Sequence, residues 1–278
     1  MNSIKVSIII ASYNSAKTIE QAISSVIEQT YPNIELLIID GGSTDGTQNI
    51  IKKYENRIAY WVSEPDNGIY DAMNKGILKS TGEYIQIIGS DDALCNKDTI
   101  ENVVSMIDND TDILSCCEWR VNEKTHIETM FSNQAAARKE IFPMMPHGAM
   151  FVRKKIFDKY TFDMSYRISA DYKFMLQCYL DNSISIKYSN LCVIYFSDAG
   201  ISSNHELSEK ENNLIYKELH LPFTITNYEK YKKLNEKKYK SIIKTVLPDC
   251  LLEKIKTIFY KKHHCNNKIC RWCGRYGR

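Results

Sequence analysis

The chain has 278 residues, of which 44% are hydrophobic, and a formal net charge of +2. This length fits one large domain or a domain with an appendage, and this apolar content is enough for a packed core. No apolar run approaches the roughly 20 residues that a membrane-spanning helix needs. Because Met1–Lys5 leads straight into an apolar run, we expect no secretory signal. Nine cysteines without such a signal indicate reduced thiols in a cytosol.

The charge is unevenly distributed along the chain. Residues 228–278 hold 15 of the 36 Lys and Arg and 4 of the 34 Asp and Glu, which gives +11 there and −9 for residues 1–227. An acidic body with a basic tail indicates that the tail contacts an anionic surface, either a membrane or a nucleic acid. We therefore divide the chain into a domain, 1–227, and a basic tail, 228–278.

Short apolar runs alternate with stretches of helical periodicity in the first part of the chain. The β-branched runs predict strands at Lys5–Ala11, Glu35–Asp40, Ile58–Val62 and Tyr84–Ile88. Apolar residues three and four apart predict helices at Ala16–Gln29, Thr47–Tyr54, Ile69–Ser80 and Lys97–Ile107. This alternation is typical of βαβ units and predicts an α/β fold with a parallel sheet.

The pattern weakens in the second part of the chain. Cys116–Val152 contains several short segments, which leaves room for an antiparallel addition to the sheet. Further on, Ala170–Leu180 is predicted as a helix and Ile184–Phe196 as one or two strands.

Two adjacent carboxylates follow one of the predicted strands. The run Ile85–Ile88 breaks at Gly89-Ser90 into Asp91 and Asp92. Carboxylates at the end of a buried strand are costly unless a cation meets them, and ligands of open α/β sheets bind outside the carboxyl ends of the strands. The plainer alternative is that Asp91 and Asp92 only begin a turn. Their position favours a site for a divalent metal and a hydroxyl-rich, phosphate-bearing ligand, as in a nucleotide-sugar enzyme.

Other candidates have equally plain alternatives. Asp40 ends a second apolar run, but Asp before Gly is also common in turns. Lys75 could lie near phosphate, or it could form a surface salt pair with Asp71 at i, i+4. Asp171 stands where an acid commonly caps the first turn of a helix. His147 is either a site residue or a loop histidine whose hydrogen bonds are satisfied.

Six segments in order carry a family resemblance. They are VSIIIASYN (6–14), ELLIIDGGSTDGT (35–47), SEPDNGIYDAMNKGI (63–77), TGEYIQIIGSDD (81–92), HGAMFVRK (147–154) and ISADYKFML (168–176). Over about residues 4–200 the chain resembles the family 2 glycosyltransferases of the GT-A fold, particularly small bacterial enzymes of capsule, O-antigen or exopolysaccharide assembly. The resemblance implies a Rossmann-like, doubly wound, mostly parallel sheet, a UDP-sugar donor, and Mn²⁺ or Mg²⁺ as cofactor.

The resemblance implies roles for residues on the donor side. Asp40 would contact the uracil, and Ser12, Tyr13 and Asn14 would form part of the base pocket. Asp91 would bind the ribose or share the metal.

It also implies roles closer to the chemistry. Asp92 would coordinate the metal against the diphosphate, and Asp171 falls where the family carries its catalytic base. Apart from the resemblance, we expect Lys75 or Arg167 to assist the diphosphate, and His147 and Arg167 are further candidates for the site or the acceptor side.

The chain departs from the family pattern at three positions near these residues. Gly89 stands first in the usual Asp-x-Asp-Asp, Gly41 replaces the second Asp of Asp-Asp-Gly-Ser, and Ala170 precedes the base where Glu is frequent. Each departure keeps the carboxylate that we expect to be essential. The Gln-x-x-Arg-Trp signature of processive synthases is absent, because Arg271-Trp272 has no Gln three positions earlier. We therefore expect single sugar additions.

The sequence thus predicts an inverting, non-processive transferase that moves a hexose or N-acetylhexosamine from a UDP-sugar to a lipid-linked glycan acceptor. The alternative is a non-catalytic nucleotide-sugar-binding subunit of a membrane assembly complex. A pyrophosphorylase would need a Gly-rich basic loop after the first strand, and a dinucleotide oxidoreductase would need Gly-x-Gly-x-x-Gly there. The chain has Ser12-Tyr13-Asn14 instead.

The basic tail contains an apolar pattern of its own. After Pro248, apolar residues at helical spacing in 251–259 are interspersed with lysines, which predicts an amphipathic cationic helix. Such a helix could bind the anionic inner face of the plasma membrane, or it could pack on the domain with its lysines in solvent. We expect a cytoplasmic, peripheral protein and no nucleic-acid partner, since no binding motif is present. The potential zinc ligands of the tail are His263, His264, Cys265, Cys270 and Cys273, a set that falls short of two clear ligand pairs.

Overall fold

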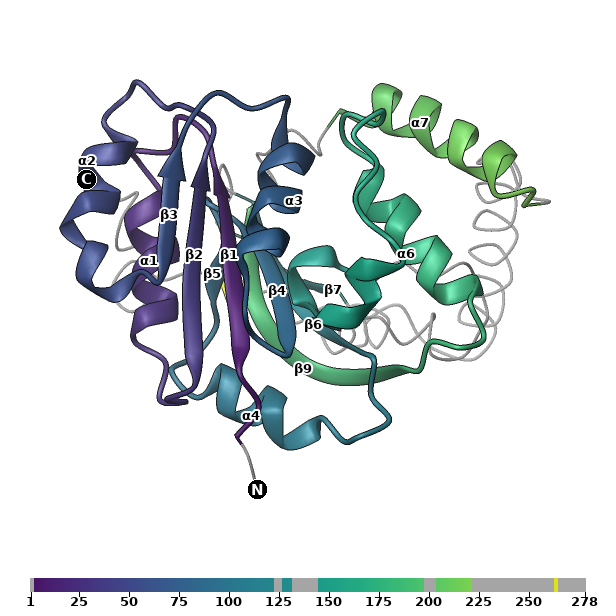
Figure 1. The fold of residues 1–278 in the computed structure, drawn as a ribbon, viewed down its shortest axis with the longest axis horizontal. Coiled ribbons are helices and arrows are strands. Elements are labelled where there is room, and N and C mark those ends of the chain that lie inside the picture. The colour runs from purple at the N-terminus through teal and green to yellow at the C-terminus, as the bar shows by residue number, and fades with distance from the viewer. Residues whose placement is uncertain (1–2, 123–126, 132–144, 198–203, 222–262, 265–278) are drawn as a thin grey trace, which may run out of the picture.

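A computed structural model describes residues 3–122, 127–131, 145–197, 204–221 and 263–264. These residues form one curved ten-stranded sheet with helices on both of its faces (Figure 1). The strands are β1 (Val6–Ser12), β2 (Ile34–Asp40), β3 (Tyr60–Ser63), β4 (Tyr84–Gly89), β5 (Ala93–Leu94), β6 (Ile113–Asn122), β7 (Ile127–Phe131), β8 (Met150–Arg153), β9 (Ile186–Ser197) and β10 (His263–His264). The α-helices are α1 (Ile19–Ile27), α2 (Thr47–Lys53), α3 (Ile69–Lys79), α4 (Thr99–Met106), α6 (Ala170–Leu180) and α7 (His205–Glu218), and the 3₁₀ helices are η1 (Glu55–Arg57), η2 (His147–Ala149) and η3 (Lys154–Asp158).

The sheet is parallel in its N-terminal half and mixed in the rest. Its order is β10-β7-β6-β8-β4-β1-β2-β3, and β9 pairs with both β5 and β6. β4, β1, β2 and β3 are parallel neighbours, and β8 then joins β4 and β6 in antiparallel fashion. The carboxyl ends of the four parallel strands therefore meet at one edge of the sheet.

The parallel strands β1, β2 and β4 are buried on both faces, which explains why they are largely continuous apolar runs rather than alternating ones. Every residue of β1 is buried. Ile9 and Leu37 belong to a core with residues of α3 and α6, whereas Ile8 and Ile38 belong to a second core with residues of α1, α2 and α4. Figure 1 shows α1 and α2 on one side of the sheet and α3 on the other. The predicted doubly wound GT-A architecture is confirmed.

The structure also tests the predicted elements one by one. The strands and helices predicted before residue 107 are all present, but α1 begins at Ile19 because the Thr18 and Ile19 amides close a turn onto the Ser15 carbonyl. The predicted antiparallel addition is confirmed by β6, β7 and β8. Ile184–Phe196 is a single strand, β9, whose register against β6 shifts near Cys117. No prediction anticipated α7. The predicted helix of the basic tail lies outside the described residues, as do Cys265, Cys270 and Cys273 of the zinc hypothesis.

Across the described ranges, no helix is both long enough and apolar enough to cross a membrane.

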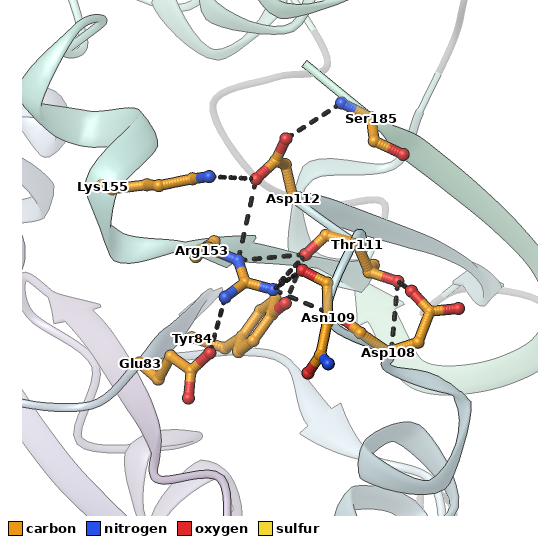
Figure 2. A network of polar contacts seen from close by, with 9 residues as sticks. All are labelled: Glu83, Tyr84, Asp108, Asn109, Thr111, Asp112, Arg153, Lys155 and Ser185. Atoms are coloured by element: carbon orange, nitrogen blue, oxygen red, sulfur yellow. Dashed lines mark hydrogen bonds and ion pairs between the residues drawn. The ribbon is translucent and has the colours of Figure 1, made fainter. Parts of the chain in front are cut away.

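Arg153, the last residue of β8, joins the starts of β4 and β6 (Figure 2). Its Nε and Nη2 donate to the Thr111 carbonyl oxygen at 3.1 and 2.9 Å, and Nη1 donates to Glu83 Oε1 at 2.7 Å. The guanidinium carbon lies 5.0 Å from the centre of the Tyr84 ring. A planar guanidinium suits such multiple contacts. These contacts lie at the edge of the sheet opposite to the carboxyl ends of the parallel strands. We therefore infer that Arg153 stabilises the fold rather than contacts a ligand.

The buried carboxylate of Glu35 has a similar role at the amino ends of β1 and β2. It accepts hydrogen bonds from Ser7 Oγ at 2.5 Å, from Thr81 Oγ1 at 2.6 Å and from the Gly82 amide at 3.0 Å, and it pairs with Lys5 at 2.7 Å. Burial alone would raise the pKa of Glu35, but the hydrogen bonds from Lys5, Ser7 and Thr81 outweigh it and lower the pKa to about 2.

We expect Glu35→Gln to lower the free energy of unfolding by about 1–3 kcal/mol at neutral pH. Because the folded pKa lies below the ordinary 4.5, this stabilisation is present above pH 4.5 and is lost as the pH falls toward 2. Denaturant unfolding of both proteins across this range measures the effect, with exposed Glu209→Gln as the control. A difference between wild type and Glu35→Gln that stays constant down to pH 2 would contradict the role of the charge.

Candidate functional site

The carboxyl ends of the parallel strands place the predicted donor-side residues together. In the sheet register Ser12 of β1 lies beside Asp40 of β2, and Asp40 lies beside Ser63 of β3. On the other side of β1, Ala11 pairs with Gly89, the last residue of β4. Asp91 and Asp92 follow directly after Gly89. One edge of the sheet therefore carries every strand-end carboxylate that the sequence singled out.

Asp40 is completely buried at this edge. Its Oδ1 accepts from Ser43 Oγ at 2.5 Å, and its Oδ2 accepts from the Ser43 amide at 2.9 Å and from Ser63 Oγ at 2.6 Å. A buried carboxylate needs such donors, because leaving it unpaired would be costly. These contacts give Asp40 a positioning role for the loop that follows β2. The predicted contact between Asp40 and uracil stays a prediction.

The loops after β1 and β2 are tied to each other. The Asn14 amide donates to Ser43 Oγ at 2.7 Å, and the Ala16 amide donates to Asp45 Oδ2 at 2.9 Å. Asn14 adopts a left-handed conformation, with φ of 48°. Ser15 Oγ lies 2.6 Å from Ser90 Oγ, which connects these loops to the segment that carries Asp91 and Asp92.

Ser12, the last residue of β1, and Tyr13, at the start of the loop that follows, are the next predicted residues of the base pocket. The Tyr13 ring is 66% exposed. Ser12 Oγ is buried and has no hydrogen-bond partner within the described part of the chain. An exposed aromatic face and an unsatisfied hydroxyl fit the predicted base pocket.

Asp91 and Asp92 turn back toward the end of β4. A Cβ on Gly89 would lie 2.6 Å from Asp91 Oδ1 and 3.1 Å from Asp92 Oδ2, so a side chain at this position would collide with the carboxylates. Asp92 is only 2% exposed, and it accepts from the Gly89 amide at 2.8 Å and the Ser197 amide at 3.3 Å. Burial, together with the charge of Asp91, raises its pKa well above the ordinary value. The glycine that breaks the family's acidic motif thus makes room for the two carboxylates that remain.

The two carboxylates fit a divalent cation. Mg²⁺ and Mn²⁺ prefer oxygen ligands, and Mg²⁺ is commonly held by one or two carboxylates with substrate phosphates and waters completing the shell. Among the described residues no cluster of three or more His, Cys, Asp or Glu could hold a metal, so this chain would rely on Asp91 and Asp92 together with its ligand. A bound cation would also relieve the repulsion between the two charges.

The 3₁₀ helix η2 lies between two predicted acidic centres, the first formed by Asp91 and Asp92 and the second by Asp171. A Cβ on Gly148 would lie 3.8 Å from Asp92 Oδ2. The residue before it, His147, has its Nδ1 3.3 Å from Asp171 Oδ2. Asp171 lies in the first turn of α6, as the sequence predicted. One turn of chain therefore lies beside the predicted metal ligand and pairs with the predicted base.

Tyr70 is a site residue that sequence reasoning missed. Its hydroxyl donates to Asp171 Oδ1 at 2.7 Å from the buried face of α3. Burial and the nearby charge of Asp171 raise the pKa of Tyr70, so it stays a donor. A buried aromatic at helical spacing looks like an ordinary core residue, and the sequence carries no signal that distinguishes it. Together Tyr70 and His147 fix both oxygens of Asp171.

The structure does not group the predicted cations with these carboxylates. Lys75 Nζ is engaged by Glu64 at 2.9 Å and Asp71 at 3.4 Å, and the hydrogen bond to Glu64 is the main cause of its raised pKa. Its predicted contact with the diphosphate would require exchanging these partners. The Arg167 side chain is exposed, and its amide donates to Glu211 of α7 at 2.7 Å. The roles of Lys75 and Arg167 stay predictions.

This fold and this arrangement of carboxylates define an enzyme site at the carboxyl edge of an α/β sheet. The model of the family described as "Glycosyl transferase family 2" matches residues 7–175, which is more than half of the chain. The chain belongs to glycosyl transferase family 2 and is a glycosyltransferase.

Individual relatives agree with this assignment. A "PGL/p-HBAD biosynthesis glycosyltransferase" of Mycobacterium bovis is 26% identical over 210 residues, which cover 71% of this chain and 78% of that protein. S. aureus TarS has the same fold: its 1–349 structure with UDP-GlcNAc matches with a TM-score of 0.62 at 23% identity, over 81% of this chain and 69% of that one. In another S. aureus TarS structure the match covers 81% of this chain but only 41% of that chain. A mannosyltransferase from Pyrobaculum calidifontis, solved with GDP-Man and Mn²⁺, matches with a TM-score of 0.59 at 19% identity, over 78% and 64% of the two chains.

We expect Tyr70→Phe to lower kcat by roughly 10- to 100-fold, the effect of removing one hydrogen bond to a charged group. Donor affinity should be unchanged, because Tyr70 contacts the predicted base rather than the strand-end carboxylates. Steady-state kinetics and calorimetry measure the two quantities.

Tyr166→Phe is the matched control for this prediction. It removes the same kind of bond, from a tyrosine hydroxyl to Glu218 at 2.7 Å, away from Asp171. An equal loss of kcat in both variants would show that Tyr70 acts only through general stability.

Proposed function

We propose that this chain is an inverting, non-processive glycosyltransferase that moves a hexose or N-acetylhexosamine from a UDP-sugar to a lipid-linked glycan acceptor in surface polysaccharide synthesis. The observation that carries the proposal is the position of η2, whose His147 pairs with Asp171 and whose Gly148 lies beside Asp92. A donor diphosphate at Asp91 and Asp92 would thereby bring its sugar next to a carboxylate on another element.

A nucleotide-sugar donor is supported by the relatives. TarS has been solved with UDP-GlcNAc and the mannosyltransferase with GDP-Man and Mn²⁺, and both share the fold of this chain. The exposed ring of Tyr13 and the unsatisfied Ser12 hydroxyl offer a base pocket at the corresponding strand ends. We propose uridine as the nucleoside and Asp91 as the residue that meets the ribose or shares the cation.

The proposed reaction is a single displacement at the anomeric carbon. The acceptor hydroxyl oxygen bonds to that carbon on the face opposite the leaving group while the bond from the carbon to the phosphate oxygen breaks, and UDP departs. Asp171 takes the hydroxyl proton as general base, a role worth roughly 10²–10⁴ in rate. Tyr70 and His147 orient Asp171 for this transfer. A Mn²⁺ or Mg²⁺ ion held by Asp92 would neutralise charge that develops on the diphosphate.

The alternative function, a non-catalytic nucleotide-sugar-binding subunit, would need the strand-end carboxylates but not a fixed base. Asp171 is instead held through both oxygens. Catalytic sites need this kind of preorganisation, and it costs conformational freedom that a binding subunit would have no reason to give up. The ordered base therefore favours the enzyme.

The first test is release of UDP from a panel of UDP-sugars with Mn²⁺, with and without chelator. We expect one donor to be hydrolysed slowly, Asp92→Ala to abolish this, and Asp171→Asn to lower the rate roughly 10²–10⁴-fold while donor binding is retained. Asp98→Asn, an exposed acid at the start of α4, is the matched control.

Two outcomes would contradict the assigned roles. Full activity of Asp92→Ala in excess chelator would exclude the metal role, and near-normal turnover by Asp171→Asn would exclude the base. Hydrolysis of GDP-mannose but of no UDP-sugar would replace uridine with another nucleoside.

The basic tail is proposed to hold the enzyme at an anionic membrane surface, where a lipid-linked acceptor resides. Lysines near such a surface contribute about 1 kcal/mol each, and residues 228–278 carry a net charge of +11. We expect the full chain to float with liposomes that contain anionic lipid and a chain ending at Thr226 to stay behind. Equal flotation of the two would refute the proposal.

A further inference from the structure

We propose that Asp66 is the carboxylate that reads the nucleobase, with its Oδ2 accepting the N3–H of uracil. This inference rests on the proposed UDP-sugar function and assigns a specificity residue within it. Asp66 lies in the segment Ser63–Gly76, whose Asp71, Asn74 and Lys75 drew attention in the sequence while Asp66 did not.

The position of Asp66 is defined by Gly41. A Cβ on Gly41 would lie 2.5 Å from Asp66 Oδ2 and 3.0 Å from Asp66 Cγ, so the carboxylate occupies the space that a side chain at position 41 would fill. Position 41 is where the family pattern often has an aspartate. The chain lacks a carboxylate on β2 at this point and receives one from the loop after β3.

The carboxylate of Asp66 is fixed through one oxygen and available through the other. Oδ1 accepts from the Gly68 amide at 2.9 Å, and Gly68, with a φ of 110°, leads into α3. Within the described residues, Oδ2 has no hydrogen-bond partner. The bond to Gly68 holds the carboxylate in place. Because Asp66 is only half-buried, the carboxylate remains accessible from solvent.

The other carboxylates near the end of β2 are already engaged. Asp40 is buried and accepts from Ser43 and Ser63 through both oxygens. Asp45 accepts from Thr47 Oγ1 at 2.6 Å and from the Ala16 amide at 2.9 Å. Of these three acids, Asp66 is the one with an oxygen that accepts no hydrogen bond from the described residues.

The neighbouring groups suit a uracil ring. The Gly41 amide donates to the Ser12 carbonyl oxygen at 2.8 Å. This bond connects Gly41, which lies beside Asp66, to the strand end that precedes Tyr13. Tyr13 offers a flat apolar face for stacking. The buried Ser12 Oγ, which has no hydrogen-bond partner within the described residues, lies on the neighbouring strand end beside Asp40. Uracil presents an N–H donor at N3 between two carbonyl acceptors. Cytosine presents an acceptor at N3, which a carboxylate would repel.

The test compares UDP with CDP on the full-length protein and on Asp66→Asn, by calorimetry with Mn²⁺ present. Asparagine can keep the bond to the Gly68 amide through its oxygen, which turns its NH₂ group toward the base. We expect UDP affinity to fall roughly 10- to 100-fold, the effect of losing a charge-assisted hydrogen bond. CDP affinity should stay the same or rise, because an amide N–H can donate to cytosine N3.

Two further variants separate recognition from folding. Asp98→Asn makes the same change at an exposed acid at the start of α4, and it should bind UDP like the wild type. The double variant Asp66→Ala with Gly41→Asp moves the carboxylate from the loop to the strand end in the vacated space. We expect it to recover most of the UDP affinity that Asp66→Ala alone loses.

The outcomes are distinguishable. If the wild type binds UDP and Asp66→Asn loses UDP and CDP affinity equally, or loses neither, then Asp66 does not read the base and the proposed function stands without it. If the wild type binds no uridine nucleotide, the proposed function and this inference are both overturned.

Discussion

The site depends on the buried carboxylate of Asp40. A charge with no solvent exposure must be met by donors, and here the donors are Ser43 and Ser63 from the segments that follow β2 and end β3. Ser43 Oγ in turn accepts the Asn14 amide from the loop after β1. Through Ser15 and Ser90 the same series of hydrogen bonds reaches the segment before Asp91. Satisfying one buried charge therefore arranges the strand-end loops on which the donor pocket is built.

A second constraint is the concentration of negative charge at this edge. Asp91 and Asp92 lie together, and the pKa of Asp92 is raised by burial and by its neighbour. Such an arrangement is tolerated when a ligand supplies compensating charge, which a cation with a bound diphosphate does. On the other side of η2, Asp171 is held by Tyr70 and His147. In the proposed function, the first centre would compensate charge and Asp171 would accept the proton.

Asp40, Asp66 and Tyr70 show what sequence patterns can and cannot assign. The apolar run before Asp40 identified it as a strand-end carboxylate, but only the structure shows that both its oxygens are engaged. Asp66 sits in a turn-like sequence and comes to the end of β2 only because Gly41 leaves space for it. The sequence around Tyr70 predicts an ordinary core residue. Its hydrogen bond to Asp171 joins residues that are 101 positions apart in the chain.

The sequence by itself determined the βα alternation, the parallel strands and the carboxylates at their ends, because apolar periodicity and turn residues act over a few positions. It also carried the family motifs, since these are local strings. Tertiary structure alone decided which carboxylates are engaged by hydrogen bonds, how β9 returns beside β6, and that α7 anchors the segment before Asp171. These features depend on contacts between distant segments, and side-chain burial and hydrogen-bond partners exist only once the chain has packed.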